Sequence, residues 1–337
     1  MPTIRDVAAL AGVSVSTVSI VLNGKAKERK VADKTNEKVL AAIDTLGYKP
    51  NMTARRLKSS EGDKPTIALF WPLDYRTAFL AGLLKGIQTG KNRLSYDCEI
   101  VVCTFESGKI AEEFNESSKN RFSGAIIGAT SAIDMKYLEG YHPPIPTVLF
   151  NRYLDDYCTV CADHQASAEK TVTLFAAKGH RRMAVITVKN ADLAMSARTA
   201  AVIAACEKYG IKIEERFIIQ CENSFAGGAL AAREFLNLPD RPKALFCDSD
   251  FLAVGAAHVF NKEKVRIPED LEIIAIGMAE PEMTEFSTPS ITVVAIPTEE
   301  MAADSIGLIY NLAGGKIKGA VHKEWEPKLL ARDSCCL

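Results

Sequence analysis

The chain has 337 residues, a formal net charge of −1 and 47% hydrophobic residues, enough for two or more folded units with their own cores. No stretch reaches the roughly 18 consecutive apolar residues that a membrane span needs. Arg5 and Asp6 interrupt the apolar start that a secretory signal requires. We therefore expect no membrane span and no export, with the nine cysteines kept as reduced thiols in a cytoplasm.

Charge is unevenly distributed along the chain. Residues 1–60 contain 11 Lys and Arg against 5 Asp and Glu, a net charge of +6, whereas the remainder has 30 against 37, a net charge of −7. A basic head on an acidic body is typical of a nucleic-acid-binding module joined to a module with another task.

The first residues predict a helix that starts at Thr3, whose hydroxyl forms an acidic capping-box pattern with Asp6. The apolar face of this helix consists of Ile4, Val7, Ala8 and Ala11. Gly12 suits a tight turn with positive φ, and Ser14 can cap the next helix.

The second predicted helix runs over residues 15–22. Val18, Val21 and Leu22 fall on its inner face. The residues left to face outward are Val15, Ser16, Thr17, Ser19 and Ile20. Two short helices joined by a Gly-containing turn suit insertion of the second helix into a DNA major groove. From spacing alone, an ordinary pair of core helices is an equally good interpretation. A third helix is predicted over residues 33–46.

Many residues of this region follow one known order with few gaps: Thr3-Ile4-Arg5-Asp6-Val7-Ala8, Ala11-Gly12-Val13-Ser14, Thr17-Val18-Ser19, Val21-Leu22-Asn23, Thr35, Val39, Leu46-Gly47-Tyr48, Pro50-Asn51, Ala54 and Leu57. This series resembles the N-terminal signature of the LacI/GalR family of bacterial transcription regulators. The resemblance implies a hinge helix over residues 51–58 that orders when two copies meet on DNA. Leu57 would then enter the minor groove as a wedge.

The same resemblance implies a set of DNA contacts in the two helices and the hinge. These are Thr3, Val15, Ser16, Thr17, Ser19, Ile20, Asn23, Lys30, Asn51, Ala54, Arg55 and Leu57. Ile20 stands where the family usually has an Arg that reads guanine, so it can pack on a thymine methyl instead. The basic loop 24–30 is about three residues longer than is usual; it either adds phosphate contacts or is simply solvated.

After a polar linker, the pattern changes to short apolar runs that alternate with helical stretches. The predicted strands are 66–71, 98–104, 124–127, 146–150, 183–188, 217–221, 244–247, 272–276 and 292–296. Predicted helices include 79–94, 166–178, 196–209, 228–236 and 252–261. This alternation favours parallel sheets covered by helices, in two units. Cys158 and Cys161 have metal-site spacing, but their alternating apolar neighbours favour a strand.

Further landmarks of the same family follow in order: Gly179-His180-Arg181, Ser196 and Arg198, Asp250 with Ala253 and Gly255, Pro289-Ser290-Ile291-Thr292, and Leu330-Ala331-Arg332. The resemblance implies an all-α helix-turn-helix domain followed by an α/β effector domain like the type I periplasmic sugar-binding proteins. Two parallel-sheet subdomains would be joined by three crossing strands, with returns near 293–296 and before 329–331.

The domain boundaries that follow are 1–50 for the helix-turn-helix domain, 51–65 for hinge helix and linker, and 66–337 for the effector-binding and dimerisation domain. Within the last, the subdomains are expected at about 66–160 with 297–322, and at about 161–292 with 323–337.

Ligands of parallel sheets bind beyond the carboxyl ends of the strands, and the resemblance implies the same loops. The candidate effector contacts are Asp74, Tyr75, Arg76, Asn151, Arg152, Ser196, Arg198, Asn223, Phe225 and Asp250. Arg198 and Asp250 lie at motif positions where the family holds its effector; a surface salt bridge and a helix cap are their respective alternatives. A polyol needs such paired donors and acceptors together with an aromatic face. An acid common in the family is missing from Met278-Ala279-Glu280.

The sequence thus predicts a repressor that binds a palindromic double-stranded operator as a homodimer in the cytoplasm, under control of a small, carbohydrate-like ligand. No cofactor, metal, membrane or enzymatic role is expected, because nucleophile, phosphate-loop and metal motifs are missing and the five histidines are scattered. An exported-type sugar-binding protein and a regulator that answers to a partner protein are the alternatives. Whether ligand releases or recruits DNA stays open.

Overall fold

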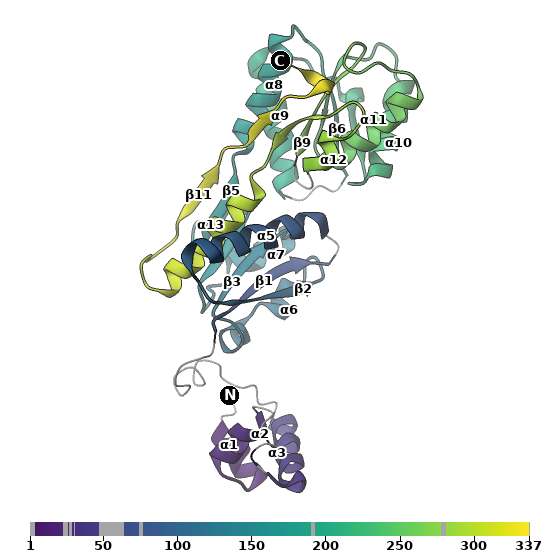
Figure 1. The fold of residues 1–337 in the computed structure, drawn as a ribbon. Coiled ribbons are helices and arrows are strands. Elements are labelled where there is room, and N and C mark those ends of the chain that lie inside the picture. The colour runs from purple at the N-terminus through teal and green to yellow at the C-terminus, as the bar shows by residue number, and fades with distance from the viewer. Residues whose placement is uncertain are drawn as a thin grey trace.

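The computed structural model describes residues 4–22, 26, 29, 31–46, 64–73, 77–189, 193–277 and 281–336. Figure 1 shows a small helical unit at the N-terminus and a larger body with two sheets. Several predicted contacts lie outside the described residues: Thr3, Asn23, Lys30, Asn51, Ala54, Arg55, Leu57, Asp74, Tyr75 and Arg76.

The N-terminal unit, residues 4–46, has the predicted helices. They are α1 (Ile4–Ala11), α2 (Val15–Leu22) and α3 (Asp33–Leu46). Its core contains the fully buried side chains of Val7, Val18 and Val39, one from each helix. Gly12 has φ +66°, and the Ser14 hydroxyl accepts a hydrogen bond from the Thr17 amide at 3.1 Å. The predicted turn and helix cap are therefore confirmed.

The body contains two sheets, each with six strands among the described residues. The first sheet consists of β1 (Thr66–Pro72), β2 (Glu99–Phe105), β3 (Gly124–Gly128), β4 (Thr147–Phe150), β5 (Cys158–Ala162) and β11 (His322–Trp325), in the order β11-β5-β4-β3-β1-β2. The second sheet consists of β6 (Ala184–Val188), β7 (Ile218–Cys221), β8 (Ala244–Cys247), β9 (Glu272–Gly277), β10 (Thr292–Ala295) and β12 (Lys328–Leu330), in the order β12-β10-β9-β8-β6-β7. All strand pairs are parallel except β10 with β12.

Helices cover both sheets. Those of the first sheet are α5 (Thr77–Leu94), α6 (Ile110–Glu113), α7 (Ala132–Glu139) and α13 (Thr298–Ala313). Those of the second are α8 (His164–Ala177), α9 (Leu193–Tyr209), α10 (Phe225–Asn237), α11 (Asp250–Lys262) and α12 (Pro281–Glu285). Short 3-10 turns lie at Glu116–Asn120, Glu215–Phe217 and Asp333–Cys335. None of the helices described is long and apolar enough to cross a membrane.

Within the described body, the chain passes between the sheets after β5, after β10 and after β11. The subdomain division expected near 160 falls inside β5. The division expected near 322 falls at the start of β11, and the chain joins the second sheet only after Trp325. The last strand, β12, then pairs Leu330 with Val293. In each sheet, two neighbouring strands thus come from distant parts of the sequence: β5 pairs with β11, and β10 pairs with β12.

All nine predicted strands are present, with ends displaced by at most one residue. The Cys158–Cys161 segment is a strand as expected, and β11 and β12 are additions. Those two have only 4 and 3 residues and alternate between exposed and half-buried positions. They lack the continuous apolar run that marks a buried parallel strand.

Glycine allows two pairs of helices to pack with their backbones in contact. A Cβ added at Gly86 of α5 would overlap the Glu299 carbonyl oxygen of α13, and one at Gly90 would lie 2.7 Å from the Ala303 carbonyl oxygen. On the second sheet, a Cβ at Gly255 of α11 would overlap the carbonyl oxygen of Phe225 in α10. No larger residue fits at these positions without a backbone shift.

The cysteines are all free thiols. From their position near the end of the chain, Cys335 and Cys336 are both expected to be exposed, and for Cys335 this expectation is wrong. Cys335 is fully buried, because the last turn folds under β9 and β10, whereas Cys336 is exposed. Burial raises the pKa of Cys335 to about 12 and that of Cys206 to about 12. These thiols are therefore protonated, and unreactive, at neutral pH.

Replacing Gly86 with Ala should lower the free energy of unfolding by roughly 1–3 kcal/mol, since α13 must move away to accommodate the methyl group. Gly82 lies on the same face, and a Cβ there would be 3.7 Å from the Thr298 methyl carbon, an ordinary contact. Gly82→Ala should therefore change stability by less than about 1 kcal/mol, in the favourable direction. Denaturant unfolding of both variants tests this; equal losses would contradict the close helix approach.

In the folded protein, one thiol should react with a chromogenic disulfide reagent at pH 8 well before the others. Cys336 is that thiol, since it is the exposed member of the nine. Cys336→Ser should remove the fast phase, and Cys335→Ser should leave it unchanged. A fast phase that survives in Cys336→Ser would show that another cysteine is accessible.

Candidate DNA-reading helix and ligand cleft

Helix α2 presents a small polar face. Ser16 is exposed, and Thr17, Ser19 and Ile20 are half-buried, while Val18 and Val21 point into the core. Val15 is also half-buried and packs against that core, so it faces outward less than the sequence suggested. Hydroxyl groups of this kind can donate to or accept from base edges and phosphates, and the Ile20 side chain offers an apolar contact.

The described candidate effector residues lie at the carboxyl ends of strands in both sheets. Asn151 and Arg152 follow β4 of the first sheet, and the others follow β6, β7 and β8 of the second. The latter are Ser196, Arg198, Asn223, Phe225 and Asp250. Parallel topology therefore gathers each set at one edge of its sheet, which is where ligands of such sheets bind.

Arg198 is buried and forms an ion pair. It lies in α9 with 1% of its surface exposed, and its Nε lies 3.0 Å from Oδ1 of Asp248, a carboxylate with no exposed surface at the end of β8. The other oxygen, Oδ2, is 3.3 Å from the Thr199 hydroxyl and 3.4 Å from the Thr187 hydroxyl. The surface salt bridge considered from the sequence is thus replaced by a buried one.

Asp250 and its neighbours form a second buried polar group. Asp250 is the first residue of α11 and is 1% exposed, and its Oδ1 accepts a hydrogen bond from the Phe251 amide at 3.0 Å. Ser249, the cap residue of α11, donates to the side-chain oxygen of Asn223 at 3.0 Å. Asn223 in turn donates to the sulfur of Met195 at 3.6 Å. These contacts link β7, α9 and α11 around the strand ends.

Asn151 and Arg152 bind their own sheet. Asn151 has φ +53°, and its side-chain oxygen accepts from the Ala162 amide at 3.2 Å, which ties β4 to β5. Arg152 donates to the carbonyl oxygens of Thr130 and Asn151 at 3.0 and 2.7 Å. Both side chains are more than nine-tenths buried. They fix the strand ends of the first sheet, whatever they contribute to a ligand.

Phe225 and Ser196 are the exposed members among the predicted effector residues that the structure describes. Phe225 is 45% exposed and its ring meets Phe251 edge to face, with centroids 4.7 Å apart. The two rings mark the starts of α10 and α11. An aromatic surface thus lies beside the buried polar group, as a sugar-binding site requires.

Asp248 is the residue that sequence reasoning missed. The family motif in this part of the sequence begins at Asp250, and Asp248 lies outside that motif. Its position directly after the apolar run of β8 was the available signal, since the first polar residue beyond a parallel strand faces the ligand edge.

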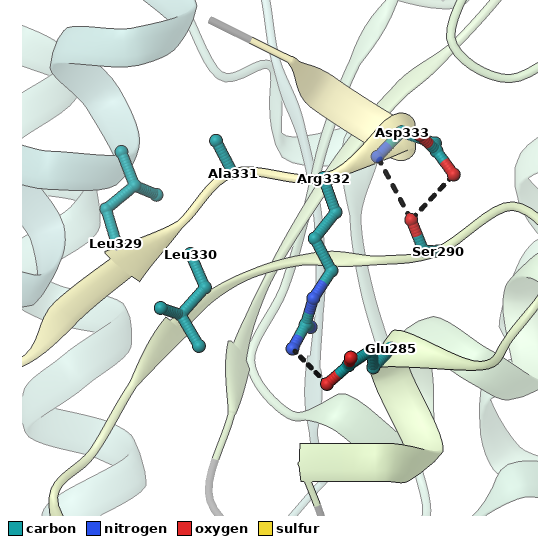
Figure 2. A pocket seen from close by; sticks show the side chains of 7 residues that line it. All are labelled: Glu285, Ser290, Leu329, Leu330, Ala331, Arg332 and Asp333. Carbon is teal, nitrogen blue, oxygen red and sulfur yellow. Dashed lines mark hydrogen bonds and ion pairs between the residues drawn. The ribbon is translucent and has the colours of Figure 1, made fainter.

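A separate surface hollow of about 730 Å³ lies beside the end of the chain, where the chain leaves β12 (Figure 2). Arg332 crosses it and donates to the Thr284 hydroxyl at 2.9 Å and to the Ile291 carbonyl oxygen at 2.8 Å. Ser290 donates to Asp333 at 2.7 Å. None of the predicted effector residues that the structure describes lines it, and these contacts hold α12 and the chain end together.

The described residues contain no cluster of three or more His, Cys, Asp or Glu side chains suited to a metal ion. The chemistry of the strand ends is that of hydrogen bonding and charge pairing.

Comparison with known proteins covers both parts of the chain. Residues 3–51 match "Bacterial regulatory proteins, lacI family", and residues 172–335 match "Periplasmic binding protein-like domain". A solved LacI family transcription regulator from Clostridium acetobutylicum is 38% identical, with a TM-score of 0.76, over 80% of this chain and 100% of that one.

Two further proteins are similar over nearly the whole length. The ribose operon repressor of Escherichia coli is 28% identical over 316 residues, which is 92% of this chain and 93% of that protein. The solved complex of the transcriptional regulator CelR with cellobiose is 26% identical, with a TM-score of 0.71, over 99% of this chain and 100% of that one. The chain belongs to the LacI family of bacterial transcription regulators, DNA-binding repressors rather than enzymes.

Proposed function

We propose that this repressor binds its operator under the control of a sugar or sugar derivative held between the two sheets. The observation that carries this proposal is that two buried polar groups lie at the second sheet's carboxyl edge, the Arg198–Asp248 pair and the group around Asp250. Burying charge is costly unless the groups are paired and hydrogen-bonded. Such charged groups at the carboxyl ends of the strands, beside the exposed ring of Phe225, suit a polyhydroxylated ligand.

The relatives support the ligand class. One is named for the ribose operon, and another was solved with cellobiose. In this chain, Arg198 supplies donors and Asp250 supplies acceptors, the combination that vicinal hydroxyls need. Ser196, Asn223 and Phe225 complete the proposed contacts of the second sheet, and Asn151 and Arg152 those of the first.

On the DNA side, we propose that two copies present α2 to the two halves of a palindromic site. Thr17, Ser19 and Ile20 reach bases, and Ser16 reaches bases or phosphates. The hinge contacts, including Leu57, lie outside the described residues and form part of the same proposal. A ligand that binds the DNA-competent form less well than the free form weakens operator binding by the same factor, and a ligand with the opposite preference strengthens it.

Replacing Ile20 with Arg should shift base preference toward guanine at one symmetric position in each half-site, because Arg can donate twice to the guanine major-groove edge. Selection of binding sites from a random pool measures this. Leu10→Arg is the matched control: Leu10 is 54% exposed on α1, so the variant adds the same charge without a base contact. The control should raise affinity for all sequences equally. An identical site preference in Ile20→Arg would place this residue away from the bases.

A ligand at about 100 times its dissociation constant stabilises a protein by roughly 2.7 kcal/mol. Thermal unfolding should therefore shift upward with at least one sugar from a panel of pentoses, hexoses and β-linked disaccharides. Asp250→Asn should abolish that shift, whereas Asp240→Asn, at a side chain that is 73% exposed, should preserve it.

A thermal shift that persists in Asp250→Asn would show that Asp250 does not contact the ligand. No shift with any sugar would favour control by a partner protein.

A further inference from the structure

The buried pair of Arg198 and Asp248 bears on the charge of the ligand. Asp248 is held from three elements: by Arg198 and Thr199 of α9, by Thr187 of β6 and by its own strand β8. The hydroxyls of Thr187 and Thr199 also lie 3.1 Å apart. The carboxylate is therefore fixed in place, with one oxygen toward the guanidinium and the other toward the hydroxyls.

Among the described residues, the buried charge at this edge is negative on balance. Of their buried side chains that follow β6, β7 and β8, Asp248 and Asp250 are acidic and Arg198 is basic. The guanidinium Nε donates to Oδ1 of Asp248, so the two opposite charges are paired directly. Arg198 is thus a hydrogen-bond donor whose positive charge is already balanced.

Because the charge of Arg198 is already balanced, neutral sugars and anionic sugars should interact with it differently. A ligand hydroxyl can accept a hydrogen bond from Arg198 without any change in net charge. A ligand carboxylate or phosphate would share the guanidinium with Asp248, so two anions would lie close together where water cannot screen them.

We infer that Asp248 is a specificity-determining residue that restricts this cleft to uncharged sugars and excludes sugar acids and sugar phosphates. The inference rests on the proposed sugar-binding function and narrows its ligand class. Asp248 acts through Arg198 and through repulsion of an incoming anion. Asp248 thus disfavours anionic sugars and also orients Arg198, the hydrogen-bond donor, for neutral sugars.

The first test uses the full-length protein. Isothermal titration at constant ionic strength compares three matched pairs: D-glucose with D-glucuronate, D-galactose with D-galacturonate, and D-ribose with ribose 5-phosphate. Whichever pair binds, the neutral member should bind more tightly than the anionic member by at least about tenfold. This comparison needs no variant, so it does not depend on how a substitution folds.

The second test is Asp248→Asn, which keeps an oxygen to accept from Arg198 Nε but removes the charge. It should lower the neutral-to-acid affinity ratio by about tenfold, mainly through tighter binding of the anion. A residue that only maintains structure would weaken both ligands together and leave the ratio unchanged. Asp240→Asn removes one negative charge from the same subdomain surface and should preserve the wild-type ratio.

Two results would overturn the inference while leaving sugar binding intact. One is tighter binding of an acid than of its neutral partner by the wild-type protein, which would point to Arg152 of the first sheet as the anion's partner. The other is an unchanged ratio in Asp248→Asn. Absence of binding by all six compounds, together with no thermal shift for any sugar of the panel above, would instead reject the sugar proposal together with the inference.

Discussion

The central constraint on this molecule is that its two sheets are built from interleaved parts of one chain. The described body crosses from one sheet to the other after β5, β10 and β11. The first sheet is therefore completed by β11, which follows β10 of the second sheet in the chain, and the second sheet is completed by β12, which follows β11. Parallel pairing then places the carboxyl ends of β6, β7 and β8 at one edge, where a second physical requirement applies. Charged groups buried there must satisfy one another, and Arg198 with Asp248 does so.

Helices pack closely on each sheet. Some residues that match the family's motifs have structural roles in this chain. Gly255 lets α11 touch the backbone of α10, and Arg332 joins the chain end to α12 and to the start of β10. Their motif status therefore does not imply ligand contact. A motif residue at the end of a strand, such as Asp250, is a better candidate for ligand contact than a motif residue where two helices cross.

Sequence reasoning located the elements that have strong periodicity. The nine predicted strands and the helices of the N-terminal unit have the apolar patterns expected of them, and Gly12 and Ser14 indicated the turn and the helix cap. It could not find β11 and β12, which are short and half-exposed. It also missed Asp248, because which carboxylate meets Arg198 depends on how α9 lies over β8, a contact between residues 50 positions apart. The burial of Cys335 has the same origin, since it depends on tertiary packing of the final turn.

The position of β12 has a consequence for the chain's tolerance of change. This strand of three residues is the edge of the second sheet, and it covers β10, whose side chains are largely buried. Shortening the protein before Lys328 would leave the β10 backbone with an unpaired edge, and an exposed apolar edge strand is a template for aggregation. Affinity tags, fusions and truncations at this end must therefore preserve β12, although it is the shortest strand in the described structure.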